Sequence, residues 1–173
     1  MKSIFVTLLI GGASGVLLGT AWAKIWAAAR TRLAWPEGAN FFRLHLSSNF
    51  VIATEIAVST IALVVPNFRL SSLLLAIIYA GFVVGATTLK GQECGCFGIE
   101  GLKVGPVHIW GCVFTAAALL ASTVSSEEIT SPRPLRLVIA LVSAVVMTAA
   151  MQLWNRLSRT VVDDAHHDQL LIV

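Results

Sequence analysis

The sequence predicts an all-α protein, a polytopic membrane helix bundle in a single domain. Of its 173 residues, 57% are hydrophobic and 12% are charged, whereas a soluble domain averages about 45–50% apolar and about 25% charged residues. The mean hydropathy is +0.84, and the apolar residues gather in runs close to the ~20 residues that a helix needs to cross a bilayer. We expect the domain to cover residues 1–156, with a polar C-terminal tail over residues 157–173. The expected spans are residues 4–28, 49–65, 70–89, 106–123 and 135–154.

The first expected span carries a row of glycines on one helix face. Gly11, Gly15 and Gly19 recur every four residues, and residues four apart share a face of a helix. A smooth strip of this kind lets another backbone approach closely, so we interpret the row as a helix-packing surface. The alternative is that a lipid or quinone tail lies in the groove.

Residues 1–23 also have features of a secretory signal peptide. Lys2 precedes an apolar core, and residues 21–23 have the A-x-A pattern of a cleavage site. The glycine row and Trp26, which lies beyond that point, favour a retained spanning helix instead.

Prolines and polar segments delimit the other elements. Residues 29–48 mix arginines with aromatic side chains, which is typical of the membrane interface, and this segment could form a short helix lying on the membrane. Pro66 ends the second span, and Pro106 suits the first turn of the fourth. Residues 125–133 form a polar loop before the fifth span.

The most informative motif is Cys94-Gly95-Cys96-Phe97-Gly98, in the polar loop before the fourth span. Two thiols one residue apart can cycle between a dithiol and a disulfide, and the small ring that such a disulfide closes is strained and easily reduced. Gly95 and Gly98 permit the backbone angles that the ring requires, and Phe97 can anchor the loop in the interface. The motif predicts a redox-active pair in which Cys94 and Cys96 are the catalytic residues.

The string from Glu93 to Gly98, followed by a spanning helix, resembles the MauE and DoxX-like family of redox-associated membrane proteins, which includes the methylamine-utilisation protein MauE. Lys24, within residues 23–25, resembles the family's small-Lys-aliphatic element. Glu55, within residues 54–56, resembles its intramembrane glutamate. The polar residues that the family has early in the fourth span are replaced here by His108, Trp110 and Cys112.

The resemblance covers about residues 5–123. It implies a four-helix MauE/DoxX-like core, to which this chain adds a fifth C-terminal span. It also implies a protein of the bacterial cytoplasmic (inner) membrane that supports maturation of a periplasmic enzyme by handling disulfides, beside a thioredoxin-like partner.

Glu55 is an ionisable residue inside an apolar helix, where an unpaired charge costs several kcal/mol, so it is a candidate functional residue. Lys24 lies near the end of the neighbouring span, and an antiparallel hairpin would bring the two together. A salt bridge that locks this hairpin is our first interpretation. The alternative is that Glu55 handles protons or contacts a quinone.

His108 and Cys112 are four residues apart and share one face of the fourth span. Cys112 is either a small apolar side chain in the helix packing, a resolving thiol for the cysteine pair, or a metal ligand. With Cys94 and Cys96, these residues would give three sulfurs and one imidazole, a set that suits Zn²⁺ or Cu(I). A metal is not our first interpretation, because a C-x-C gap is shorter than the usual ligand spacing.

Together these observations predict a membrane thiol–disulfide relay or maturation factor that works with a thioredoxin-like or other membrane or periplasmic protein. A structural subunit of a larger multi-subunit membrane complex, packed through the glycine row, is the alternative, and a metal-binding site is a further one. No haem, flavin or nucleotide motif is evident, which leaves a quinone or a metal ion as candidate cofactors. The basic residues lie in loops beside the lipid bilayer, so we do not expect nucleic acid as a partner.

Two observations disagree about the side on which the cysteine loop lies. Five spans put the N-terminus opposite this loop, and more arginines and lysines fall on the cysteine side, which the positive-inside rule places in the cytoplasm. Thiol–disulfide relays, however, usually act on the oxidising outer side. We expect the loop on the outer face, with the charge distribution as the argument against it.

Overall fold

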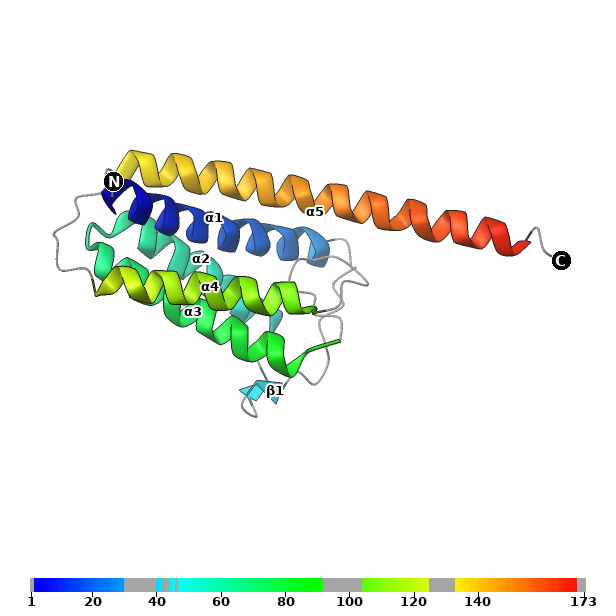
Figure 1. Ribbon diagram of the computed structural model, residues 1–173, viewed down its shortest axis with the longest axis horizontal. Helices are drawn as coiled ribbons and strands as arrows, with labels where there is room; N and C mark the ends of the chain where they lie inside the picture. Colours follow the sequence, from blue (N-terminus) through cyan, green and yellow to red (C-terminus); the bar gives the residue numbers. More distant parts are fainter. Residues whose placement is uncertain are drawn as a thin grey trace.

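The computed structural model describes residues 2–29, 40–41, 44–45, 47–91, 104–124 and 133–170. Five helices account for nearly all of them (Figure 1). They are α1 (Lys2–Ala29), α2 (Ser48–Val64), α3 (Phe68–Thr88), α4 (Pro106–Thr123) and α5 (Arg133–Leu170), and two short strands, β1 (Asn40–Phe41) and β2 (Leu44–His45), form an antiparallel pair.

The helix ends are set by side-chain caps and prolines. The Ser47 hydroxyl accepts a hydrogen bond from the Phe50 amide and caps α2, which ends just before Pro66. The Asn67 side chain then accepts from two amides of the first turn of α3, so a three-residue turn is enough to reverse the chain. Pro106 occupies the first turn of α4, where its missing N–H costs nothing.

The five expected spans each coincide with a helix, and two segments differ from their expected local structure. Between the end of α1 and the start of α2, the described residues 40–41 and 44–45 form the strand pair β1 and β2, and no helix occurs among the described residues there. The end of α5 differs too, because the helix continues to Leu170, well into the segment expected as a polar tail. Residues 135–170 contain neither glycine nor proline, so nothing in that stretch breaks the helix.

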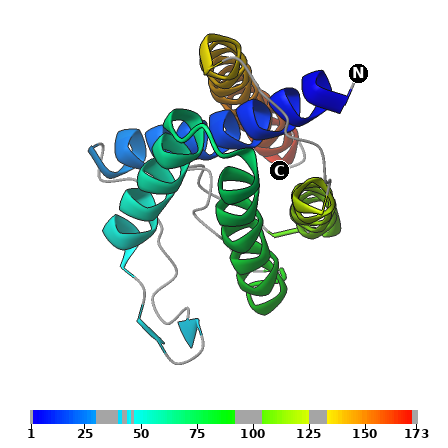
Figure 2. The same ribbon diagram turned by 90° about the vertical axis from the view of Figure 1, so that its left-hand side faces the viewer.

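Helix α1 lies at the centre of the bundle and contacts the other four helices. It packs most extensively against α5, which crosses it at an angle (Figure 2), while α2 packs on another side of α1 (Figure 1). The α3–α4 pair forms the remaining part of the bundle, and Figure 2 shows α4 well separated from α5. The largest apolar side chains that are at most 1% exposed are Ile10, Leu17, Leu75 and Leu119.

Four helices are long and apolar enough to cross a membrane: α1, α3, α4 and residues 133–150 of α5. Helix α2 is also apolar, but it has 17 residues. Large apolar side chains are exposed along α4 and α5, among them Phe114, Leu141 and Val145, and such a surface suits contact with lipid. The length and composition of these helices indicate an integral membrane protein.

The bundle has two ends, and the elements near each can be named. At one, the end of α1 lies with the start of α2, the end of α3 and the start of α4; we call it the loop end. At the other lie the start of α1, the α2–α3 turn and the start of α5; we call it the turn end (Figure 1). Helix α5 begins at the turn end and extends far past the loop end (Figure 1).

Candidate functional site

The cysteine motif, Cys94 to Gly98, lies outside the described residues, but the two points from which its loop departs are described. Lys90, after α3, and Val104, before α4, form an isolated β-bridge at the loop end. The Gly91 amide donates to the Val104 carbonyl at 3.1 Å, and Gly91 has a φ of +81°, which suits glycine. The segment 92–103 is therefore tied at its base.

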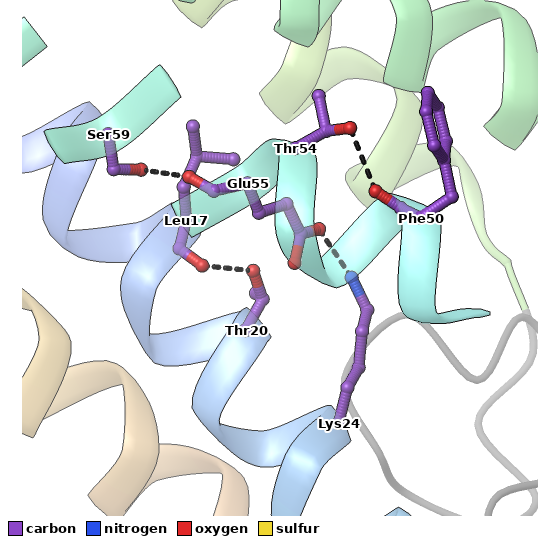
Figure 3. A network of polar contacts seen from close by, with 7 residues as sticks. All are labelled: Leu17, Thr20, Lys24, Phe50, Thr54, Glu55 and Ser59. Atoms are coloured by element: carbon purple, nitrogen blue, oxygen red, sulfur yellow. Dashed lines mark hydrogen bonds and ion pairs between the residues drawn. The ribbon is translucent and has the colours of Figure 1, made fainter. Parts of the chain in front are cut away.

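Lys24 and Glu55 form a buried ion pair between α1 and α2. The Lys24 ammonium donates to Glu55 Oε1 (Figure 3), and both side chains are only 2% exposed. Lys24 lies in the second-last turn of α1 and Glu55 in the second turn of α2, because the hairpin brings the end of one helix beside the start of the other. The structure therefore brings together the two ionisable residues selected from the sequence.

The second carboxylate oxygen of Glu55 has no hydrogen-bond partner among the described residues and is buried. The Thr20 side chain, one turn before Lys24 on α1, faces this carboxylate (Figure 3). Its hydroxyl donates its proton to the Leu17 carbonyl at 2.9 Å. With this proton on the Leu17 carbonyl, Glu55 Oε2 faces the Thr20 oxygen, and a rotated Thr20 hydroxyl would donate to the Glu55 carboxylate instead.

Two aromatic residues of α3 complete the surroundings of the pair. The Lys24 ammonium lies 5.9 Å from the centre of the Phe82 ring, within the range of a cation–π contact. Phe82 meets Tyr79 edge to face at 6.0 Å between ring centres. The Tyr79 hydroxyl donates to the Ala13 carbonyl of α1 at 3.0 Å, so α3 is hydrogen-bonded to the helix that carries Lys24.

His108 and Cys112 lie one turn apart on α4, and both are half-buried. Cys112 packs against the apolar core that includes Tyr79 and Leu119, so its surroundings are those of a small apolar side chain. His108 stands in the first turn of α4, at the loop end. Within the described ranges, no group of three or more His, Cys, Asp or Glu side chains is placed to hold a metal ion.

The glycine row of α1 faces α5. A Cβ on Gly11 would lie 2.9 Å from the side chain of Ile139, and one on Gly15 would lie 2.7 Å from Ser143 Cβ and closer still to the Ala140 carbonyl oxygen. The groove is thus filled by a helix of the same chain rather than by a lipid or quinone tail. Small side chains opposite the row let the two backbones approach this closely.

No protein-family model, curated protein or solved structure matches this chain.

Three residues near the candidate site or the α5 contact were not selected from the sequence. Thr20 had a detectable signal, because it lies four residues before Lys24 and so shares its helix face. Phe82 had none, since one phenylalanine in an apolar span is unremarkable. Arg136 is fully buried at the turn end, where its guanidinium donates to the Val65 carbonyl at 3.1 Å; as an arginine just inside an apolar run it was detectable.

Proposed function

We propose that this protein is a membrane thiol–disulfide relay or maturation factor of the MauE/DoxX-like type, in which Cys94 and Cys96 are the reacting residues. It acts in the bacterial cytoplasmic membrane with its cysteine loop on the outer face, beside a thioredoxin-like partner. The fold that we propose for it is a five-span bundle in which α1 to α4 form the family-like core and α5 is an addition.

The observation that carries this proposal is the tied base of the loop. The bridge between Lys90 and Val104 joins the segment containing Cys94 and Cys96 to one end of a bundle of apolar helices. Cys94 follows Gly91 by three residues, so the thiols are attached within a short chain distance of the helix ends. That arrangement supports a thiol pair held at the membrane surface, where a partner protein has access.

The exchange itself balances within the two proteins. A thiolate of the pair attacks a disulfide sulfur of the partner and gives a mixed disulfide, with the partner's other sulfur leaving as a thiolate. The second cysteine then attacks the mixed disulfide, which leaves a Cys94–Cys96 disulfide and a fully reduced partner. Two electrons and two protons pass to the partner, and the reverse sequence reduces the pair.

The remaining family-like residues have supporting parts in this proposal. The Lys24–Glu55 pair joins α1 to α2 near the loop end, where the chain connects these two helices. Cys112, which packs against the core, is treated as a packing residue. His108, at the start of α4, is the residue that we assign to lowering the pKa of a nearby thiol, because an imidazolium favours the thiolate.

The proposal is tested by maleimide labelling of the full-length protein in intact cells, with Cys112 replaced by serine so that only the pair reacts. We expect a membrane-impermeant maleimide to add two mass shifts after reduction and none before it. C94S and C96S should each label once without reduction. Protection from the impermeant reagent after reduction, together with labelling by a permeant one, would contradict the outer placement. If both thiols were labelled in cells to which no reductant had been added, the proposed redox role would be contradicted.

A further inference from the structure

The buried carboxylate of Glu55 is bound on one side only. Oε1 accepts from the Lys24 ammonium, whereas Oε2 has no hydrogen-bond partner among the described residues. The side chain is 2% exposed, so bulk water does not surround this oxygen. A buried acceptor without a partner is costly, and native structures rarely keep one without a function.

A proton bound to Glu55 Oε2 would have a hydrogen-bond acceptor nearby, the Thr20 hydroxyl. The Thr20 hydroxyl faces the carboxylate (Figure 3), and it can direct its single proton either to the Glu55 carboxylate or, as drawn, to the Leu17 carbonyl. Its lone pairs remain, because a hydroxyl has one donor and two acceptor positions. In the second arrangement two acceptors face each other, and one proton on Oε2 would turn this contact into a hydrogen bond from Glu55 to Thr20.

The surroundings also stabilise the charge of the Lys24 ammonium, which remains when the Glu55 carboxyl is neutral. Protonation of Glu55 would leave the Lys24 ammonium without its counter-ion in an apolar bundle. The face of the Phe82 ring lies 5.9 Å from that ammonium, and an aromatic face attracts a cation most strongly where water is absent. The carbonyl oxygen of a neutral carboxyl can also keep accepting from Lys24.

We propose that Glu55 is an intramembrane proton-binding site that takes up and releases one proton at Oε2. Thr20 is the acceptor that holds the protonated form, Lys24 is the cation that holds the carboxylate, and Phe82 stabilises that cation when the carboxyl is neutral. The ligand is a proton alone, and no electron transfer is involved. The site uses only residues outside the cysteine loop, so its test does not depend on the proposed thiol chemistry.

The titratable groups around Glu55 come from each helix packed near it. Lys24 belongs to α1, and Tyr79 of α3 interacts electrostatically both with Glu55 and with Cys112 of α4. Glu55 is the only acidic residue within residues 2–29, 47–91, 104–124 and 133–150. A buried protonated carboxyl within these ranges can therefore be assigned to Glu55, and E55Q tests that assignment for the whole chain.

Infrared difference spectroscopy tests the site on the full chain in maltoside micelles, which contain no carbonyl group. We expect a carboxylic-acid carbonyl band that grows reversibly as the pH is stepped from mildly alkaline to mildly acidic, shifts in D₂O, and is missing from E55Q. The expected loss in E55Q is complete at that band position. Absence of any such band in the wild type while the protein stays folded would overturn the proposal.

Three further variants separate a proton site from a purely structural salt bridge, and none of them removes the carboxyl group. In T20V the acid loses its acceptor, so the band should move to higher frequency, whereas T20S keeps the hydroxyl and should leave the band where it is. In K24M the carboxylate loses its cation, so the band should reach its full amplitude already at the alkaline end of the series. An unshifted band in T20V would overturn the assignment of Thr20, and a K24M spectrum with no band would overturn the site.

Discussion

At the scale of single residues, the Lys24–Glu55 pair is the clearest electrostatic feature of the molecule. Both charges are removed from water, and their mutual attraction has to offset that desolvation. Such a pair adds little stability over a well-packed apolar replacement, but it strongly penalises the loss of one partner. Its structural effect is to fix how α1 and α2 are aligned along each other.

This asymmetry predicts the outcome of a double-mutant cycle. We expect E55L, which leaves the Lys24 ammonium unpaired, to lower the free energy of unfolding by about 3–5 kcal/mol. The double variant K24M/E55L should recover most of that loss, because no buried charge remains. Denaturant unfolding in micelles, followed by circular dichroism, measures all the variants of the cycle. Additive losses in the double variant would show that the two side chains do not interact.

At the scale of helices, the contact between α1 and α5 is the most extensive in the bundle. Its register advances evenly: Gly11 meets the Arg136 carbonyl, Gly15 the Ala140 carbonyl, and Gly19 the Ala144 carbonyl. Residue numbers along both helices rise in the same direction, so α1 and α5 have the same N-to-C orientation. The closeness varies along the row, since a Cβ on Gly19 would come no nearer than 3.3 Å to α5.

The varying closeness predicts a rank order of alanine substitutions. G15A should be the most destabilising, because its Cβ would collide with the Ala140 carbonyl, with G11A next and G19A least. Overpacking of this kind costs about 1–3 kcal/mol. Thermal unfolding in micelles gives the order.

Gly111 of α4 supplies a matched control, since a Cβ there would meet nothing within 4 Å. G111A should leave stability unchanged or raise it by up to about 1 kcal/mol, through the better helix propensity of alanine. If G111A and G15A were equally damaging, close packing against α5 would not be the cause.

At the scale of the whole molecule, α1 is the inner helix and α5 is a long peripheral one. With 38 residues, α5 is about 57 Å long at 1.5 Å per residue, whereas the hydrocarbon core of a bilayer is about 30 Å thick. The described contacts of the glycine row reach only as far as Met147. The part of α5 beyond the bundle therefore contributes little to holding the five helices together.

Removing residues 151–173 should accordingly leave the bundle intact. We expect the shortened protein to unfold within about 0.5 kcal/mol of the full chain, the range of a change far from any packed contact. Denaturant titration of the two proteins in the same micelles makes the comparison. A large loss would mean that the distal half of α5 packs on the bundle.

Much of this fold could be predicted from the sequence, since each apolar run of near-spanning length became a helix. Prolines and caps limited the errors at the ends, as at Pro66 and Pro106. The continuation of α5 was missed because a run of polar residues after Trp154 looked like a tail, although polarity alone does not end a helix. The strand pair was missed because its two strands have only two residues each, too few to show an alternating pattern of apolar and polar residues.

Some features of the candidate site could likewise be predicted from the sequence, and others could not. The pairing of Lys24 with Glu55 could be expected, because an antiparallel arrangement of the first two spans places both residues near the same end. The Thr20 and Phe82 contacts could not, since they depend on how α1, α2 and α3 are rotated about their axes. The partner of the glycine row was also undetermined, because a strip of small residues indicates close packing without indicating the helix that fills it.

The docking of α5 onto α1 has a consequence for biosynthesis. The ribosome makes the glycine strip of α1 first and its partner last, with α2, α3 and α4 threaded into the membrane in between. During that interval the strip faces lipid, the insertion machinery or a wrong helix. The bundle is therefore complete only after α5 has been made. A chain stalled before α5 would leave the glycine strip of α1 uncovered and accessible to quality-control proteases.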